Sequence, residues 1–236
     1  MARKIILDFG THHGEGLHKM IQFHKADETW KIYSFEANPY TYAQFEALRT
    51  GISDIDGMKS RLPWLDWDVT YVNKAVWSEN KEVGISCVRD KHDSINLEQL
   101  YDEPAGIGME HIKIPLSEHF VSGASTIMVQ GNETSLDDTN SRVVVRTEAF
   151  DVSEWFKNNL QEDDYVALKV DIEGAEYEVL KQLISTGAID RVNWIAVEWH
   201  PEAMLATENG LWLKGCIDGY LSRMQDKGEL EISTWV

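Results

Sequence analysis

The sequence predicts an α/β fold in which a mostly parallel, doubly wound sheet carries helices on both faces. Three observations lead to this prediction. Short apolar runs at 5–7, 165–170 and 192–197 lack helical period, as strands buried on both faces of a sheet do. A glycine-rich turn joins the first run to a helical pattern. Strand and helix patterns then alternate along the chain, which is typical of parallel sheets.

The first apolar run ends in a turn that contains Asp8, Gly10, Gly14 and Gly16. Glycines permit positive φ angles, and the free N–H groups of the following helix attract polar ligands. The spacing differs from the Gly-x-Gly-x-x-Gly pattern of dinucleotide-binding proteins, and Asp8 stands where a pyrophosphate would lie. An acid suits a ligand with a positive end, such as S-adenosylmethionine (SAM). A tight turn without a ligand is the alternative interpretation.

Polar or small residues also follow the next two predicted strands. Glu36 ends the strand at 30–35, twenty residues after the last glycine of the turn. At this offset an acidic side chain accepts hydrogen bonds from a ribose diol in nucleotide-binding sheets, although exposed acids at strand ends are common. Asn73 and Ala75 follow the strand at 69–72, where Asn73 could hydrogen-bond an adenine ring and Ala75 could pack against it.

The other elements follow from apolar periodicity and from the residues at their ends. Pro39 suits the first turn of a helix, and Asp-Val-Ser-Glu at 151–154 is a capping-box pattern. The run at 82–88 predicts a strand antiparallel to 75–78. The further elements expected are helices at 17–25, 39–48, 151–160, 175–184 and 211–225 and strands beginning at 143 and closing the chain at 229–236.

A second group of polar residues follows the last two buried runs. Asp171 ends one run, on the sheet edge where ligands bind in such folds. Glu173 and Glu176 stand near the first turn of the next helix, where acids also stabilise the helix dipole. Glu198 and His200 end the last run, on one face if the strand continues. With Asp171 they could form a proton-transfer pair or a divalent-metal site, or a structural ion pair and helix cap.

Composition limits the classes of partner. The chain of 236 residues has 22 Lys and Arg against 40 Asp and Glu, so its net charge is 22 − 40 = −18. Nucleic acids and anionic membranes are disfavoured as partners, since both need a positive surface. The sequence contains neither a signal-peptide pattern nor an apolar stretch of about 18 residues, and its two cysteines lie far apart. We therefore expect a cytoplasmic protein.

We expect one domain over 1–236. Within it, 89–141 is irregular and rich in Pro, Gly, Asp and Ser, yet contains apolar residues. A connection of this length in a compact domain is usually a lid or a binding loop. We therefore expect 89–141 to be an acceptor-site cap or insertion.

Five short motifs stand in order along the chain. They are Ile-Leu-Asp-Phe-Gly-Thr-His-His-Gly (6–14), Ser-Phe-Glu-Ala-Asn-Pro (34–39), Asn-Lys-Ala-Val (73–76), Leu-Lys-Val-Asp-Ile-Glu-Gly-Ala-Glu (168–176) and Val-Glu-Trp-His (197–200). With these motifs the chain resembles the FkbM-type methyltransferases, class I SAM-dependent enzymes with a Rossmann-like sheet. Members of that family typically methylate hydroxyl groups on sugars and other secondary metabolites. The segment 89–141 has no counterpart in the resemblance, and the chain after His200 looks short for the two strands that close a class I sheet.

The resemblance implies a SAM site at the carboxyl ends of the strands. The implied cofactor-binding residues are Asp8, Gly10 and Gly14 for the methionine moiety, Glu36 for the ribose, and Asn73 and Ala75 for the adenine. Asp171 would face the transferring methyl group, and Asp171 or His200 would take the proton of a small-molecule or carbohydrate acceptor. No metal ligand is predicted, although a divalent ion could bind the acidic cluster.

Two alternatives remain open at this point. The first is a SAM- or nucleoside-binding module without turnover, because the acceptor side cannot be interpreted from the sequence. The second is a nicotinamide-dependent oxidoreductase, which the glycine spacing disfavours.

Overall fold

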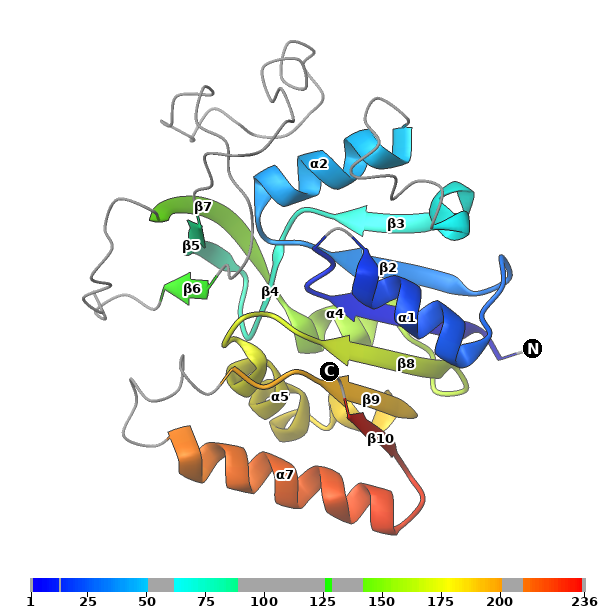
Figure 1. Cartoon of the computed structure of the whole chain (residues 1–236). Coiled ribbons are helices and arrows are strands. Elements are labelled where there is room, and N and C mark those ends of the chain that lie inside the picture. The colour runs from blue at the N-terminus through cyan, green and yellow to red at the C-terminus, as the bar shows by residue number, and fades with distance from the viewer. Residues whose placement is uncertain are drawn as a thin grey trace.

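Six parallel strands form the main sheet, in the order β10-β9-β8-β1-β2-β3 (Figure 1). The computed structural model describes residues 2–12, 14–50, 62–88, 126–128, 142–200 and 210–234. The strands of this sheet are β1 (Lys4–Phe9), β2 (Lys31–Phe35), β3 (Val69–Val72), β8 (Tyr165–Val170), β9 (Trp194–Val197) and β10 (Glu231–Thr234). The predicted α/β fold with a mostly parallel sheet is confirmed.

The sheet is doubly wound, as predicted. The chain moves outward from β1 through β2 to β3, and later outward on the other side from β8 through β9 to β10. The strand order therefore reverses between β1 and β8, and the carboxyl ends of all six strands lie along one edge. In open α/β sheets ligands bind outside this edge, at the point of reversal. Within the described residues β10 closes the sheet beside β9, so a single strand follows β9.

Helices cover both faces of the sheet. Side chains alternate between the two faces along each strand, so both faces carry apolar side chains that the helices bury. Ile5, Leu7 and Phe9 pack in one apolar cluster with the helices of the C-terminal half, whereas Ile6 packs in a second cluster on the opposite face. Both clusters are buried, which explains the continuous apolar runs. The helices on the Ile5 face are α4 (Val152–Asn159), α5 (Glu176–Ser185) and α7 (Gly210–Asp226), with the 3₁₀ turn η5 (Ala188–Arg191). Those on the Ile6 face are α1 (Glu15–His24), α2 (Pro39–Thr50) and the 3₁₀ turn η3 (Pro63–Asp66).

A smaller sheet of four strands has the order β4-β7-β5-β6. Its strands are β4 (Ala75–Trp77), β5 (Lys81–Val88), β6 (Thr126–Met128) and β7 (Arg142–Asp151). The predicted pairing of 82–88 with 75–78 is wrong, because β7 lies between the two segments. Ala149 is opposite both Ala75 in β4 and Lys81 in β5, so its strand occupies the place that the prediction gave to a hairpin.

For α4, the half of the predicted capping box that Asp151 forms is confirmed. The Asp151 carboxylate accepts hydrogen bonds from the backbone N–H groups of Ser153 (2.8 Å) and Glu154 (3.0 Å). Glu154 accepts a hydrogen bond from the Asn80 side chain (2.9 Å), so its carboxylate points to the start of β5.

Two further predictions can be compared only with the residues that the structure describes. Within the predicted cap at 89–141, the structure describes only β6. The cap and the single domain over 1–236 therefore stay predictions. Among the described helices, none combines the length and the apolar character that a membrane crossing requires.

Candidate active site

The loop after β1 turns sharply at Gly10 and Gly14, whose φ angles are 83° and 89°. At Gly10 a Cβ atom would lie 1.7 Å from the backbone oxygen of Asp171, and at Gly14 it would lie 2.9 Å from the rings of Phe45 and Trp64. The glycines are therefore required by the left-handed backbone and by the packing around the loop. This requirement holds with or without a ligand, so their role toward a cofactor stays a prediction.

Glu36, at the end of β2, holds the glycine loop. Its Oε2 accepts a hydrogen bond from the His12 backbone N–H (2.9 Å), and its Oε1 accepts one from the Asn38 N–H (2.8 Å). Burial raises the pKa of the Glu36 carboxyl, although both N–H groups act in the opposite direction. A carboxylate offers about four acceptor positions. Two hydroxyl groups of a ribose could use those that the two N–H groups leave.

Asn73 and Ala75 lie where β3 leads into β4. The Asn73 side-chain amide donates to the backbone oxygen of Glu36 (2.8 Å), so it fixes the end of β2. Ala75 is buried in a small cluster with Trp77 and packs against Ala37. Both residues thus have a structural role beside Glu36, and their contacts with an adenine ring stay a prediction.

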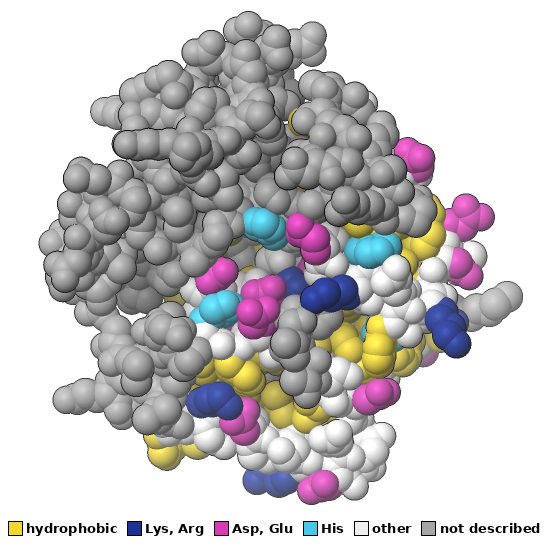
Figure 2. Space-filling view, in the orientation of Figure 1, with side chains coloured by type: hydrophobic (Ala, Val, Ile, Leu, Met, Phe, Trp, Pro, Cys, Tyr) yellow, Lys and Arg dark blue, Asp and Glu magenta, His cyan; other side chains and the backbone are white. Residues whose placement is uncertain are grey.

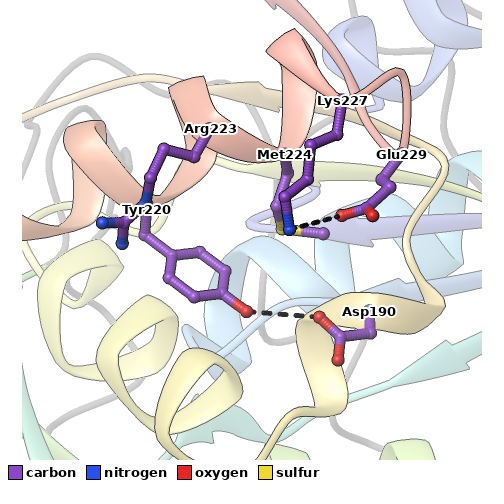
Figure 3. Close-up of a pocket in the computed structure, with 6 residues that line it drawn as sticks. All are labelled: Asp190, Tyr220, Arg223, Met224, Lys227 and Glu229. Atoms are coloured by element: carbon purple, nitrogen blue, oxygen red, sulfur yellow. Dashed lines mark hydrogen bonds and ion pairs between the residues drawn. The ribbon is translucent and has the colours of Figure 1, made fainter.

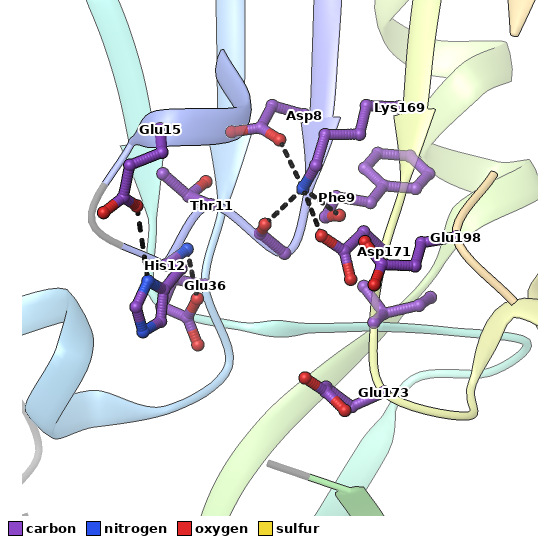
Figure 4. Close-up of polar contacts among 12 residues, drawn as sticks. Asp8, Phe9, Thr11, His12, Glu15, Glu36, Lys169, Asp171, Glu173 and Glu198 are labelled. Carbon is purple, nitrogen blue, oxygen red and sulfur yellow. Dashed lines mark hydrogen bonds and ion pairs between the residues drawn. The ribbon is translucent and has the colours of Figure 1, made fainter. Parts of the chain in front are cut away.

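Lys169 is a residue of this region that the sequence predictions did not include (Figure 4). Its Nζ lies 3.1 Å from Asp8 Oδ1 and 3.2 Å from Asp171 Oδ2, and donates to the Gly10 backbone oxygen at 2.6 Å. The Lys169 side chain is 1% exposed and that of Asp8 is 0% exposed. Burial disfavours the ammonium, but the two carboxylates outweigh it and raise the pKa of Lys169.

The ammonium of Lys169 therefore joins the ends of β1 and β8 at the point where the strand order reverses. Asp8, in β1 just before the glycine loop, faces this ammonium. The sequence did carry a signal, because Lys169 stands between Leu168 and Val170 in a buried strand. A lysine in such a position requires anionic partners.

Glu176 shapes the loop between β8 and α5. Its fully buried carboxylate accepts hydrogen bonds from the backbone N–H groups of Ile172 (2.9 Å) and Gly174 (2.9 and 3.1 Å). Within this loop Glu173 has φ 55° and Gly174 has φ 103°. A left-handed glutamate costs about 1–3 kcal/mol and persists where the surrounding contacts fix it. The bonds to Glu176 supply those contacts.

His200 lies at the centre of the acidic group. Its Nδ1 is 2.9 Å from Glu176 Oε1, and its Nε2 is 3.4 Å from Glu173 Oε2 and 3.9 Å from Glu198 Oε1. The hydrogen bond with Glu176 raises the pKa of His200 to about 9, although burial opposes it. At neutral pH the ring is thus protonated and can donate but cannot accept.

The structure brings Asp171, Glu198 and His200 together, with one ligand atom from each within 4.8 Å of the others. This grouping is the one expected from neighbouring strand ends. A histidine must be deprotonated to bind a metal ion. A metal ion would therefore have to displace the proton of His200, and both the proton-transfer and the metal interpretation of the group stay predictions.

Figure 2 shows Asp, Glu and His side chains gathered near the middle of the face seen in Figure 1.

A pocket of about 430 Å³ lies elsewhere, between η5 and the end of α7 (Figure 3). Tyr220 donates to Asp190 there (3.3 Å), and Lys227 pairs with Glu229 (3.6 Å). Because η5 precedes β9, this pocket lies at the amino ends of the strands. It is therefore separate from the residues considered above.

Raising the pH from about 6.5 to about 9 is expected to lower the free energy of unfolding. His200 has a higher pKa in the folded chain than its ordinary 6.5, so its stabilising effect is complete below pH 6.5 and is lost as the pH rises through about 9. The slope from one such group is at most about 1.4 kcal/mol per pH unit. Urea unfolding at several pH values should show a flatter dependence for His200→Gln. Equal slopes would contradict the interpretation.

Comparisons with known proteins find a family match and a structural neighbour. The family model described as the methyltransferase FkbM domain matches residues 8–216. A solved structure of methyltransferase FkbM from Methylobacillus flagellatus KT aligns with a TM-score of 0.41 and 10% sequence identity. The alignment covers 91% of this chain and 37% of that one, so the chain spans little more than a third of that protein. No curated protein matches the chain.

Proposed function

Because this chain belongs to the FkbM methyltransferase family, we propose that it transfers a methyl group from SAM to a hydroxyl group of a small molecule or carbohydrate. The observation that carries the proposal is the position of Glu36. Its carboxylate is fixed by N–H groups of the glycine loop (2.9 Å) and of Asn38 (2.8 Å), beside the start of α1. An acid at the end of the second strand, next to such a loop, is placed to bind a ribose diol.

The charges at the strand ends fit a cofactor with a positive end. Asp8, Asp171 and Lys169 together carry one net negative charge, because the ammonium neutralises one of the two carboxylates. SAM supplies the chemistry as a methyl group on a positive sulfonium. We propose that Gly10 and Gly14 border its methionine moiety, with Asp8 acting through the pair with Lys169.

The remaining cofactor contacts follow the strand order. Glu36 would bind the ribose, and Asn73 and Ala75 would border the adenine beside it, since the Asn73 amide already contacts the backbone of Glu36. This places the nucleoside toward β2 and β3. Asp171 then lies on the methyl side of the cofactor, next to β1.

Much of the rate should come from aligning the acceptor oxygen with the methyl group, which contributes up to about 7–11 kcal/mol in well-oriented systems. Asp171 and His200 are proposed to contact the acceptor. His200 could serve as a base only near or above pH 9, because below that pH the ring already carries the proton.

Calorimetry with S-adenosylhomocysteine and with NADH tests the cofactor class. We expect the first to bind and the second not to bind. Glu36→Ala should weaken binding by about 1–3 kcal/mol, because it leaves the ribose hydroxyls without their acceptor. Glu28→Ala, an exposed acid before β2, is the matched control and should bind like the unmodified chain. NADH binding without S-adenosylhomocysteine binding would instead support an oxidoreductase.

Turnover separates an enzyme from a binding module. The chain is incubated with SAM and a panel of monosaccharides, polyols and small alcohols, and release of S-adenosylhomocysteine is measured. Release that depends on an added acceptor supports methyl transfer. Tight cofactor binding with release at the background rate for the whole panel would favour the binding module.

A further inference from the structure

We propose that Glu173 is the catalytic residue that accepts the proton of the acceptor hydroxyl, an inference that rests on the proposed function. Glu173 follows β8 at the ligand-binding edge of the sheet. Its Oε2 lies 3.4 Å from His200 Nε2, and its side chain is 31% exposed, so it is within reach of a bound acceptor. Figure 4 shows it on the loop that begins at Asp171.

The backbone of the loop supports a functional position for Glu173. Its φ of 55° is rare for a residue with a side chain, and acids at a helix N-terminus do not need it. The buried Glu176 carboxylate binds the N–H groups of Ile172 and Gly174, on either side of Glu173. These bonds hold Glu173 in the left-handed conformation, with its carboxyl group beside His200.

The neighbouring groups are less suited to receive this proton. Glu176 is fully buried and already accepts from three N–H contacts and His200. The Asp171 carboxylate is paired with the Lys169 ammonium at 3.2 Å. His200 already carries a proton, and Glu198 is 44% exposed with its Oε1 3.9 Å from His200. Glu173 is partly buried and close to the same ring.

Electrostatics give Glu173 the strength of a base that works at neutral pH. Burial raises its pKa to about 7, although the His200 imidazolium opposes the effect, while Asp171, Glu176 and Glu198 act with burial. A general base is most effective when its pKa lies near the working pH. Glu173 is therefore half ionised near neutrality and can both take up and release a proton.

The proposed step balances in atoms and charge. The acceptor oxygen forms a bond to the methyl carbon while the carbon–sulfur bond breaks, and the sulfonium becomes a neutral thioether. The O–H bond of the acceptor breaks and its proton passes to a Glu173 carboxylate oxygen. Protonated His200, held through Nδ1 by Glu176, donates through Nε2 and keeps Glu173 in place.

Glu173→Gln tests the proposal, because it preserves the size of the side chain and removes the base. Turnover should fall roughly 10²-fold or more, while affinity for S-adenosylhomocysteine stays within about twofold, since the base acts on the acceptor. In the unmodified chain the rate should rise with pH through about 7, and Glu173→Gln should lose this rise. Glu178→Gln, at a partly exposed acid of α5 that pairs with Lys181, is the control and should keep both rate and profile.

A second measurement does not require an acceptor. Carbon-13 NMR of the side-chain carboxyl groups should show Glu173 titrating near pH 7, and Glu173→Gln should lower the pKa of His200 by removing a facing carboxylate. Unchanged turnover and pH profile in Glu173→Gln would overturn the proposal. If no acceptor supports turnover, the proposed function fails separately. In that case a Glu173 that titrates at the ordinary pH of a glutamate, near 4.5, overturns the inference as well.

Discussion

Gly10→Ala is expected to lower the free energy of unfolding by about 3 kcal/mol or more, because among the described glycines an added methyl group would make its closest contact here. The new Cβ atom would lie 1.7 Å from the backbone oxygen of Asp171, in a residue with φ 83°. The loop cannot move away easily, because the Asp171 N–H donates to the Phe9 oxygen (3.1 Å) and Lys169 binds the Gly10 oxygen (2.6 Å).

Gly228→Ala is the matched control for this substitution. Gly228 also has a positive φ, of 73°, but nothing lies within 4 Å of a Cβ atom built there. Its loss should be about 1 kcal/mol, which is the effect of the backbone conformation alone. Urea unfolding of both variants separates the steric contact from the backbone effect. Equal losses would show that the ends of β1 and β8 can separate without penalty.

The elements of the main sheet could be predicted because each depends on local pattern. β1, β2 and β8 are each an apolar run without helical period. Each is followed by a turn with glycine or proline and then by a helical repeat. The second sheet could not be predicted in the same way. β5 pairs with β6 and β7, which are both far along the chain, and the pattern of 82–88 carries no information about which strands lie beside it.

In the candidate site, too, some features could be predicted from the sequence and others could not. The placement of Glu36, Asp171 and His200 at strand ends follows from the order of the strands, and the structure agrees. The orientation of Asp8 depends on Lys169, which reaches it from a strand 161 positions later (169 − 8 = 161). Contacts of this kind are set by tertiary packing and leave a weak signal in the sequence.

The protonation states of the site residues could not be predicted from the sequence. The sequence predicts that Asp171 or His200 takes the proton of the acceptor. In the structure His200 donates a hydrogen bond to the buried carboxylate of Glu176, which sequence reasoning treats as a helix-capping acid, and this bond raises the pKa of His200 to about 9. The left-handed backbone of Glu173 has no sequence signature either, because only the contacts of the folded loop select it.

Lys169→Met is expected to lower the free energy of unfolding by about 3–5 kcal/mol, because it leaves the carboxylates of Asp8 and Asp171 without their shared ammonium. Asp8 is fully buried, so water cannot replace the lost partner. Methionine has a similar length and is apolar, so the effect comes from charge more than from volume. Lys157→Met, at an exposed lysine of α4, is the control and should change stability little.

The double variant Asp8→Asn with Lys169→Met shows whether charge is the cause. Removing the buried carboxylate together with the ammonium should recover much of the loss, since the pair then disappears as a unit. The single variant should also gain stability as the pH falls, because an unpaired buried carboxylate takes up a proton more readily than an exposed one. Urea unfolding at pH 5 and pH 8 measures both effects. A double variant that is less stable than Lys169→Met alone would mean that Asp8 stabilises the loop without the ammonium, through its contact with Ser34 (3.4 Å).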